Sequence, residues 1–454
     1  MSAQVVIVGG GISGLSAAYD LAKAGIPYTL IEKENRLGGV IQTSCWDGCL
    51  LEGGPDSFLS TKSEGLALIK ELGLSDEVIG SNDSSRTTFL LRNGRLTSLP
   101  EGMTMFIPTR ALPMLKTDLF SWSTKIGMGL ELLHRPVTHP DRSVSEFVID
   151  HFGPETLEYL AEPLLSGVYG GDPEQMSINS VLPRFVEMEK RTGSLARAVL
   201  QGKKAVPSHG GSLPFQTTLR SGLGKLIERI SQGVNVRNGV VQSIERQGSG
   251  WRVKVERDWM EASHVILACP AWAAAHVVEH ADMRLAELLH AIPYSSSVTL
   301  AMVYRASEFN GKRAGFGFLV PRKERDRLLG CTFVGAKFPN RVPPDKITLR
   351  CFFGGTSDAA AVAESEETLI AQAREELERI LSLTAKPIHT SLSRWPEAMA
   401  QYTVGHADRL KEIESRTAAL SGLYLAGNAY TGIGIPDCIR MGRQAAQKIR
   451  ASVP

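Results

Sequence analysis

Two glycine-rich turns, one near each end of the chain, contain residue types suited to binding a phosphorylated cofactor. The first is Gly9-Gly10-Gly11-Ile12-Ser13-Gly14, which follows the apolar run Val5–Val8 and precedes a helical pattern. In such a turn the first glycine permits a tight bend, Gly11 lets the backbone approach a pyrophosphate, and Gly14 lets the helix pack on the strand. The helix N-terminus adds free N–H groups and a positive dipole. This turn is therefore predicted to bind the pyrophosphate of a dinucleotide.

Two further signals follow the first turn. Glu32 ends the next predicted strand, where its carboxylate can accept both ribose hydroxyls of an adenosine. The run Arg36-Leu37-Gly38-Gly39-Val40 comes next, and flavoproteins resembling the glutathione reductase and amine oxidase groups carry R-x-G-G at this place. Together these signals favour FAD. Backbone N–H groups beside the flavin ring are expected from the run Gly54-Pro55-Asp56-Ser57-Phe58.

The second glycine turn is expected to bind the other end of the same cofactor. Ala426 and Gly427 end a strand, residues 431–435 leave backbone N–H groups free, and Pro436 suits a first helical turn. The following helix N-terminus would face the N1–C2=O edge of the flavin and stabilise the negative charge of its reduced form. Cys438 lies inside this helix, past the ring, so non-covalent FAD is predicted.

The elements that position these turns are Rossmann-like pieces at the start, middle and end of the chain. The strand Val5–Val8, the helical pattern over 14–23 and the strand Tyr28–Glu32 form a βαβ unit. Further pieces are a helix and strand after residue 224, a strand over 264–268, and the last strand and helix. We therefore expect one nucleotide domain built from separate segments, with a second domain inserted between them.

Composition bounds the class of protein. The 454 residues are 43% hydrophobic and 22% charged, with a net charge of +2, so nothing indicates a nucleic-acid partner. The six cysteines form neither CxxC pairs nor Cys/His clusters, so no metal site is expected, and a cytoplasmic location fits. Neither a signal peptide nor an apolar run of eighteen residues is recognisable. The apolar stretch 103–133 favours an ordinary helical lobe, but peripheral membrane contact or a substrate-channel wall stays open.

Taken together, these motifs resemble the FAD-dependent protoporphyrinogen IX and coproporphyrinogen III oxidase family, most closely its soluble bacterial members. The resemblance covers nearly the whole chain. It rests on GGGISGL, NRLGG, GPDSF, IPT, EPLLSGVYGGDP, QYTVGH and GNAYTGIGIPDCI, of which EPLLSGVYGGDP is the most specific. It implies oxidation of a porphyrinogen to a porphyrin in haem biosynthesis, by three two-electron reductions of FAD. Oxygen then reoxidises the flavin and gives hydrogen peroxide.

The resemblance also implies an architecture. A discontinuous FAD-binding domain would comprise 1–45, 215–279 and 386–454. An inserted α+β substrate domain would comprise 46–75, 170–214 and 280–385, with a small helical lobe at 76–169. Expected partners are the porphyrinogen and O2. Hand-over of the product to the next haem-pathway enzyme stays open.

Site residues carry over from the family position by position. The cofactor-binding positions are Gly9, Gly10, Gly11, Ile12, Ser13, Gly14, Glu32, Lys33, Val40, Gly54, Pro55, Asp56, Ser57, Ile433, Gly434 and Ile435, with Arg36, Gly39 and Gly427 from the motifs above. Val241 and Trp395 match adenine and flavin contacts. Gly167 matches a glycine at the reacting face, and Leu319 and Phe352 match apolar residues that sandwich the macrocycle.

One departure concerns the anchor for a substrate propionate. Plant and animal members carry an arginine where this chain has Thr104. Lys62 follows GPDSFL, where related bacterial enzymes carry a basic residue, so we expect Lys62 to bind a propionate, with Arg110 as the next candidate. Coproporphyrinogen III, with four propionates, is slightly favoured over protoporphyrinogen IX, with two.

The sequence leaves two other functions open. One is an amine oxidase or carotenoid desaturase on the same fold. The other is a non-catalytic binding protein of the Rab-escort type, which a yellow, flavin-absorbing solution would exclude.

Overall fold

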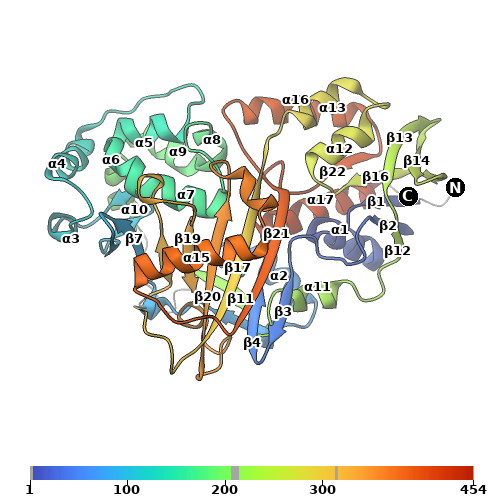
Figure 1. The fold of residues 1–454 in the computed structure, drawn as a ribbon. Helices are drawn as coiled ribbons and strands as arrows, with labels where there is room; N and C mark the ends of the chain where they lie inside the picture. Colours follow the sequence, from blue (N-terminus) through green and yellow to red (C-terminus); the bar gives the residue numbers. More distant parts are fainter. Residues whose placement is uncertain (1–3, 206–213, 312–314, 453–454) are drawn as a thin grey trace.

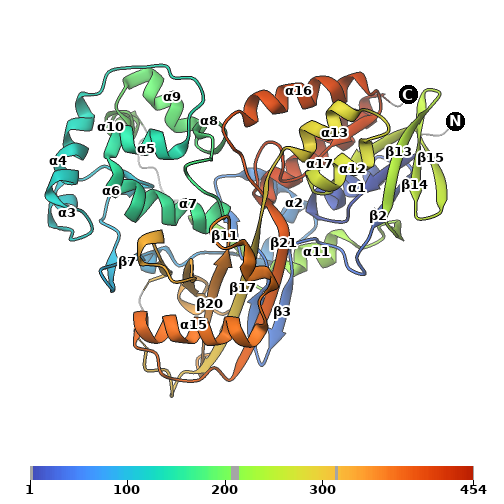
Figure 2. The same cartoon turned by 45° about the horizontal axis from the view of Figure 1, so that its top comes forward.

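The computed structural model describes residues 4–205, 214–311 and 315–452, so small parts of the expected domain ranges lie outside it. Three regions lie side by side (Figures 1 and 2). A region with a parallel sheet contains both ends of the described chain, a mostly antiparallel sheet lies in the middle, and a helical lobe lies at the other end. The predicted α/β class, with a discontinuous nucleotide-binding region, is confirmed.

The parallel sheet assembles strands from four distant segments in the order β12-β2-β1-β16-β22. These strands are β1 (Val5–Val8), β2 (Tyr28–Glu32), β12 (Val236–Asn238), β16 (His264–Leu267) and β22 (Leu423–Leu425). All four residues of β1 are buried, as expected for a strand covered on both faces. Helices α1 (Ile12–Lys23) and α17 (Ile435–Ser452) pack against each other beside this sheet. The predicted hairpin is present and has a third strand: β13 (Val241–Gln247), β14 (Gly250–Val255) and β15 (Asp258–Ala262).

The central sheet has seven strands in the order β21-β17-β20-β19-β18-β7-β8. They are β21 (His389–Ala400), β17 (Tyr294–Arg305), β20 (Lys346–Gly354), β19 (Gly330–Phe333), β18 (Gly317–Leu319), β7 (Thr88–Arg92) and β8 (Arg95–Ser98). Alternate residues such as Phe318, Cys351 and Phe353 join the core with α15 (Glu366–Leu381). Because strand side chains alternate between faces, the neighbours Leu319 and Phe352 point to the opposite face.

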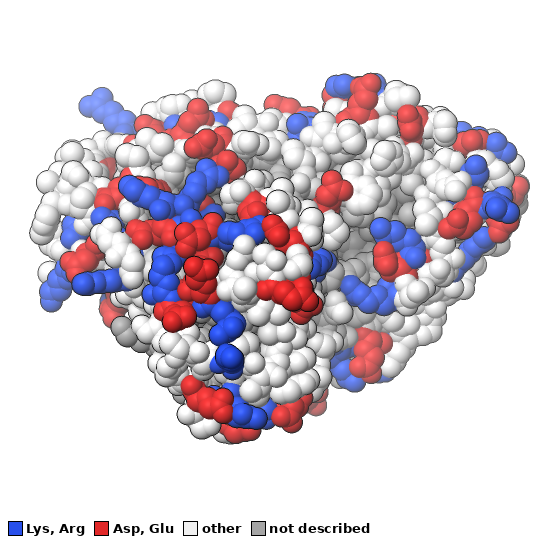
Figure 3. Space-filling view, in the orientation of Figure 1, with Lys and Arg blue, Asp and Glu red and all other residues white. Residues whose placement is uncertain are grey.

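The lobe is helical from α3 to α10. Its helices are α3 (Ala111–Lys116), α4 (Trp122–Leu130), α5 (Val144–Phe152), α6 (Pro154–Thr156), the π-helix η4 (Leu157–Ala161), α7 (Glu162–Tyr169), α8 (Ile178–Val181), α9 (Pro183–Thr192) and α10 (Leu195–Ala205). α5 begins with a reciprocal cap in which Ser143 Oγ accepts the N–H of Glu146 and Glu146 accepts that of Ser143. In Figure 3 the surface at the end that bears α3 and α4 is mostly white, that is, uncharged.

Short elements link these regions. They are β3 (Thr43–Trp46), β4 (Cys49–Glu52), β5 (Phe58–Leu59), α2 (Ser63–Glu71), β6 (Val78–Gly80), β9 (Met103–Thr104), β10 (Ile107–Pro108), β11 (Gln216–Leu219), α11 (Gly224–Ile230), α12 (Ala271–Val278), α13 (Met283–His290), α14 (Val334–Lys337) and α16 (His406–Ala419). Across the described ranges, none of the helices has the length and apolar character needed to cross a membrane.

The sheets divide the chain differently from the expected domain ranges at three places. Strands β7 and β8 belong to the central sheet rather than to the lobe, because β7 pairs in parallel with β18. Strand β21 also belongs to the central sheet, through its pairing with β17. Helices α9 and α10 pack on each other and, through α10, on the 131–133 turn of the lobe. The domain division we propose therefore moves 88–98 and 389–400 to the central region and 178–205 to the lobe.

Candidate active site

The first glycine turn connects β1 to α1. It is tightly packed at Gly9 and Gly14 but open at Gly11. A Cβ added to Gly9, where φ is +106°, would lie 2.8 Å from the carbonyl oxygen of Ala268. One added to Gly14 would lie 2.0 Å from the carbonyl oxygen of Gly9. By contrast, a Cβ on Gly11 would meet no described atom within 4 Å. Gly9 and Gly14 are thus needed for the turn's own packing, and Gly11 borders open space that we expect a pyrophosphate to occupy.

Backbone donors face that space. The first hydrogen bond of α1 runs from the N–H of Leu15 to the carbonyl of Gly11, 3.0 Å away. The N–H groups of Ile12, Ser13 and Gly14 precede it and have no acceptor within the helix. They are the donors expected to bind phosphate oxygens.

Glu32 lies at the end of β2, beside this turn. Its carboxylate accepts the N–H of Gly10 at 2.6 Å and that of Glu34 at 2.9 Å, which leaves further lone pairs for ribose hydroxyls. The chain approaches Glu32 again at Gly239, whose N–H donates to the Glu32 carbonyl, two residues before Val241. Lys33 is exposed and pairs with Glu34 at 3.7 Å.

The Arg36 turn packs directly on the glycine turn. The N–H of Gly38 donates to the carbonyl of Gly10 at 2.8 Å, and a Cβ on Gly39 would lie 3.4 Å from Cα of Gly11. The guanidinium of Arg36 donates to the carbonyl of Gly39 at 2.5 Å. In this structure Arg36 therefore closes its own turn.

The loop after β4 is fixed beside the same turn. A Cβ on Gly54 would lie 1.8 Å from the carbonyl oxygen of Val40, so only glycine fits there. The indole N–H of Trp395 donates to the carbonyl of Gly53 at 2.8 Å, and the Arg36 guanidinium lies 5.9 Å from its ring centre. Trp395 thus lies between the Arg36 turn and the loop that contains Gly54.

A buried group of charges anchors this loop. The ammonium of Lys337 lies 2.9 Å from each carboxylate oxygen of Asp56, and Arg350 lies 3.6 Å from one of them. Burial alone would raise the pKa of Asp56, but the positive charges of Lys337 and Arg350 outweigh it and hold that pKa well below its usual range. Arg350 also donates to the carbonyl of Gly54. Neither cation was expected from the sequence, although each interrupts an apolar run.

The second glycine turn has a matching anchor. The hydroxyl of Tyr402 accepts the N–H of Gly432 at 2.9 Å and donates to the carbonyl of Asn428 at 2.8 Å. The ring of His406 stacks on Tyr402, with 4.2 Å between ring centres. Tyr402 lies in the QYTVGH motif, which therefore shapes the turn after Gly427, where φ is +140°.

The helix after this turn is placed by α1. A Cβ on Gly442 would lie 2.1 Å from the carbonyl oxygen of Ser13, so the two helices touch backbone to backbone there. Gly434 precedes Gly442 by eight residues, or about 12 Å along a helix. The N-terminus of α17, with Ile433 and Ile435 on either side of Gly434, therefore lies about that far from the phosphate-binding turn along α17. This spacing suits two ends of one long cofactor.

The two residues expected to bind propionates lie apart. The ammonium of Lys62 forms an ion pair with Asp437 of α17. Arg110 caps α3 on the helical lobe, is largely exposed, and lies 3.4 Å from Glu101. Figures 1 and 2 place α3 at the far end of the molecule from α17.

The residues expected to contact the macrocycle share one row across the central sheet. Leu319 and Phe352 both pair with Gly330, on the strand between them. A Cβ on Gly167, in α7, would lie 3.1 Å from Cδ2 of Leu319. The guanidinium of Arg350 lies over Phe352, 4.9 Å from the ring centre. The structure thus brings Gly167, Leu319 and Phe352 to one face of the sheet.

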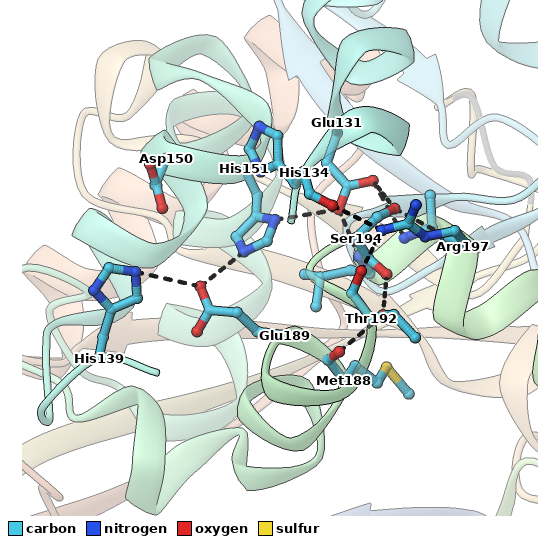
Figure 4. Close-up of polar contacts among 12 residues, drawn as sticks. Glu131, His134, His139, Asp150, His151, Met188, Glu189, Thr192, Ser194 and Arg197 are labelled. Atoms are coloured by element: carbon cyan, nitrogen blue, oxygen red, sulfur yellow. Dashed lines mark hydrogen bonds and ion pairs between the residues drawn. The ribbon is translucent and has the colours of Figure 1, made fainter. Parts of the chain in front are cut away.

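One group of possible metal ligands lies in the lobe (Figure 4). His139, Asp150 and Glu189 have ligand atoms within 4.8 Å of one another. The guanidinium of Arg142 already bridges the carboxylates, 3.1 Å from Asp150 and 2.5 Å from Glu189, and Glu189 also contacts His151. A metal ion would have to displace that positive charge, so we interpret the group as an ion-pair cluster. The absence of a metal centre stays a prediction.

Comparison with known proteins identifies the family in which this geometry occurs. Residues 12–450 match the family described as flavin containing amine oxidoreductase. Coproporphyrinogen III oxidase from Bacillus subtilis (strain 168) is 33% identical, over 97% of this chain and 97% of that protein. Protoporphyrinogen oxidase from Homo sapiens is 31% identical, over the full length of both. A solved structure from Exiguobacterium sp. 255-15, assigned as a protoporphyrinogen oxidase, has a TM-score of 0.87 at 31% identity, covering 100% of this chain and 99% of that one.

These relatives confirm the resemblance drawn from the motifs. The family, the two helix N-termini and the open space beside Gly11 agree on the cofactor. The chain belongs to the flavin-containing amine oxidoreductase family, and it is an FAD-dependent oxidoreductase.

Proposed function

We propose that this protein oxidises a porphyrinogen to the corresponding porphyrin in haem biosynthesis, with oxygen as the final electron acceptor. Six electrons would leave the substrate in three two-electron steps, with one hydrogen peroxide formed per step. The observation that carries the proposal is the shared face of Gly167, Leu319 and Phe352, together with full-length similarity to relatives named for this reaction.

The chain's own residues would support this reaction by positioning the substrate. Bound FAD would supply the redox chemistry. Leu319 and Phe352 are two strand spacings apart, about 9–10 Å, with only the hydrogen of Gly330 between them. A flat apolar macrocycle edge fits such a floor, and the bare backbone of Gly167 covers it from α7. Each two-electron step removes a hydride equivalent and a proton from the substrate, and bound FAD would take up both on its reduction to FADH2.

Coproporphyrinogen III is the substrate that we favour, because the Bacillus subtilis relative is named for it. The test is to supply the purified holoenzyme with coproporphyrinogen III, protoporphyrinogen IX and, as a control, putrescine. We expect porphyrin fluorescence with three hydrogen peroxide molecules per porphyrin, and the higher kcat/KM on coproporphyrinogen III. A flavin-loaded protein that oxidises putrescine but neither porphyrinogen would instead be an amine oxidase.

The helical lobe supports a second part of the proposal, contact with an anionic membrane surface. Its α3, α4 and the following turn expose large apolar side chains: Leu112 (71%), Trp122 (64%), Ile126 (62%), Leu130 (57%) and Leu133 (74%). Lys116 and Arg135 are exposed beside them, and the ammonium of Lys125 lies 4.6 Å from the Trp122 ring centre. A surface that mixes Trp, apolar and cationic side chains suits a lipid interface with acidic headgroups.

Co-sedimentation with lipid vesicles tests the membrane contact. Binding should be stronger to vesicles with phosphatidylglycerol than to pure phosphatidylcholine, and the Trp122→Ser/Ile126→Ser variant should bind neither. A Trp259→Ser variant, which changes an exposed tryptophan on β15, is the matched control. Equal sedimentation of parent and lobe variant would contradict the proposal.

A further inference from the structure

An ion pair joins the N-terminus of α17 to the segment that follows the Gly54 loop. Asp437 is the third residue of α17, and its Oδ2 accepts the N–H of Gly434 at 3.2 Å. The ammonium of Lys62, which caps α2, pairs with the same oxygen. Only 12% of the Asp437 side chain is exposed, against 41% for Lys62. The carboxylate is therefore fixed in the turn, and its nearest compensating charge comes from a residue 375 positions away.

Both charges lie against the backbone of the second glycine turn. A Cβ on Gly432 would lie 2.4 Å from Cγ of Asp437. A Cβ on Gly434 would lie 3.1 Å from Oδ2 of Asp437 and 4.0 Å from the ammonium of Lys62. The second cation nearby, Arg440, is 3.9 Å from Asp437 and donates instead to Thr431 at 2.8 Å.

The charge of Asp437 reaches other parts of the site. Burial, and after it the negative charge of Asp437, raises the pKa of Tyr169, in the SGVYGG motif of α7. The helix dipole places positive potential at this N-terminus, and an uncompensated carboxylate would offset it, so that less of it would stabilise a second negative charge nearby. The carboxylate would also repel the negative charge that two-electron reduction places on a flavin bound at the same turn.

We propose that Lys62 sets the reduction potential of the bound flavin by neutralising Asp437 at the N-terminus of α17, rather than by binding substrate. This role makes Lys62 a positioning residue that acts through Asp437. It rests on FAD binding at the two glycine turns and does not depend on which substrate is oxidised.

The test measures midpoint potentials of the holoenzyme by anaerobic photoreduction against reference dyes, with no porphyrinogen present. Lys62→Met should make the flavin at least tenfold harder to reduce at equilibrium, which for a two-electron couple is a fall of about 30 mV. Asp437→Asn, which still accepts the N–H of Gly434, should raise the potential. The double variant should return close to the parent, and Lys62→Arg should match it.

Lys23→Met is the matched control, because it removes one lysine charge from an exposed pair with Glu71 that Arg443 continues to satisfy. Its potential should equal that of the parent. The proposal is overturned if Lys62→Met keeps the parent's potential, or if Lys23→Met shifts it equally. A raised KM for coproporphyrinogen III with unchanged potential would assign Lys62 to a propionate. If Lys62→Met fails to retain FAD, the midpoint potential of Asp437→Asn becomes the deciding measurement. A potential of Asp437→Asn at or below that of the parent would contradict the proposal.

Discussion

Gly167 of α7 faces Leu319 of β18 so closely that a Cβ on Gly167 would lie 3.1 Å from Cδ2 of Leu319. Gly167 itself is exposed, and Leu319 is half-buried on the sheet face opposite the α15 core. The contact defines how near the helical lobe approaches the central sheet at the proposed substrate face. The contact could not be predicted from the sequence, because 152 positions separate the two residues.

Gly167→Ala should therefore displace the Leu319 side chain and lower kcat/KM on the porphyrinogen about tenfold, with FAD content unchanged. The added methyl must push the end of a flexible side chain, so the fold should persist. Leu319→Ala should lower kcat/KM by itself, and Gly167→Ala should add little further loss in that background, because the two changes share one contact. Gly129→Ala in α4, whose Cβ would meet no described atom within 4 Å, should leave activity at the parent value. A loss that Leu319→Ala does not change would place the role of Gly167 elsewhere.

Gly11→Val should abolish FAD binding without unfolding the protein. Gly11 has an ordinary φ of −70°, and no described atom lies within 4 Å of its Cβ position, so the side chain would enter only the space expected for the pyrophosphate. Flavin absorbance should be lost while the circular dichroism spectrum stays that of the apo-protein. Gly14→Val is the contrast, since its Cβ would lie 2.0 Å from Gly9 and should prevent folding. Parent-level flavin in Gly11→Val would show that the pyrophosphate binds elsewhere.

The sequence predicted those parts of the fold that residues close together in the chain specify. The βαβ unit, the two glycine turns and the hairpin after Val241 are each specified by a few neighbouring residues, and all are present. The parallel pairing of β7 with β18 was not predictable in this way, because the partner strands are more than 200 residues apart and neither carries a distinctive pattern. The helical lobe was therefore given two strands that belong to the central sheet.

In the candidate site, too, features specified by neighbouring residues were predictable and contacts between distant segments were not. The glycines expected to bind the cofactor by their backbone were identifiable because the turns themselves need glycine. The partners of charged side chains were not: Lys62 was expected to bind a propionate and Asp56 to offer its backbone to the flavin, and neither expectation included the ion pairs that the structure shows. Lys337, Arg350 and Asp437 supply the compensating charges, and each comes from a distant segment. A charged residue inside an apolar run, as in Arg350, was the available signal.

Bound FAD should be released completely by heat denaturation, because the cysteines that adjoin the two glycine turns, Cys269 and Cys438, are poorly suited to attach it. Burial raises the pKa of Cys438 to about 12 and that of Cys269 to about 12, so both thiols stay protonated and weakly nucleophilic. After boiling and filtration, all the flavin absorbance should appear in the filtrate. Flavin that remains with the precipitated protein after washing in denaturant would show a covalent bond.

The stability of the protein is expected to depend on pH through a buried histidine in the helical lobe (Figure 4). His151, whose side chain is 1% exposed, lies between two carboxylates, 3.2 Å from Glu131 and 3.1 Å from Glu189. Burial alone would lower the pKa of His151, but the hydrogen bonds that its ring N–H groups donate to both carboxylates outweigh it and raise that pKa. Arg142 and His139 also face Glu189, at 2.5 Å and 4.0 Å.

A pKa that is higher in the folded than in the unfolded state stabilises the fold fully below the unfolded value, about 6.5 for histidine. That stabilisation is lost as the pH rises through the folded pKa. The unfolding temperature of the apo-protein should therefore fall as the pH is raised from 6.5 to 9. His151→Gln should be less stable at pH 6.5 by roughly 3–5 kcal/mol, because it leaves two buried carboxylates without their shared cation. It should also show a shallower fall with pH. His139→Gln, at a more exposed position, should keep the parent's slope, and an equal slope in parent and His151→Gln would mean that another group titrates.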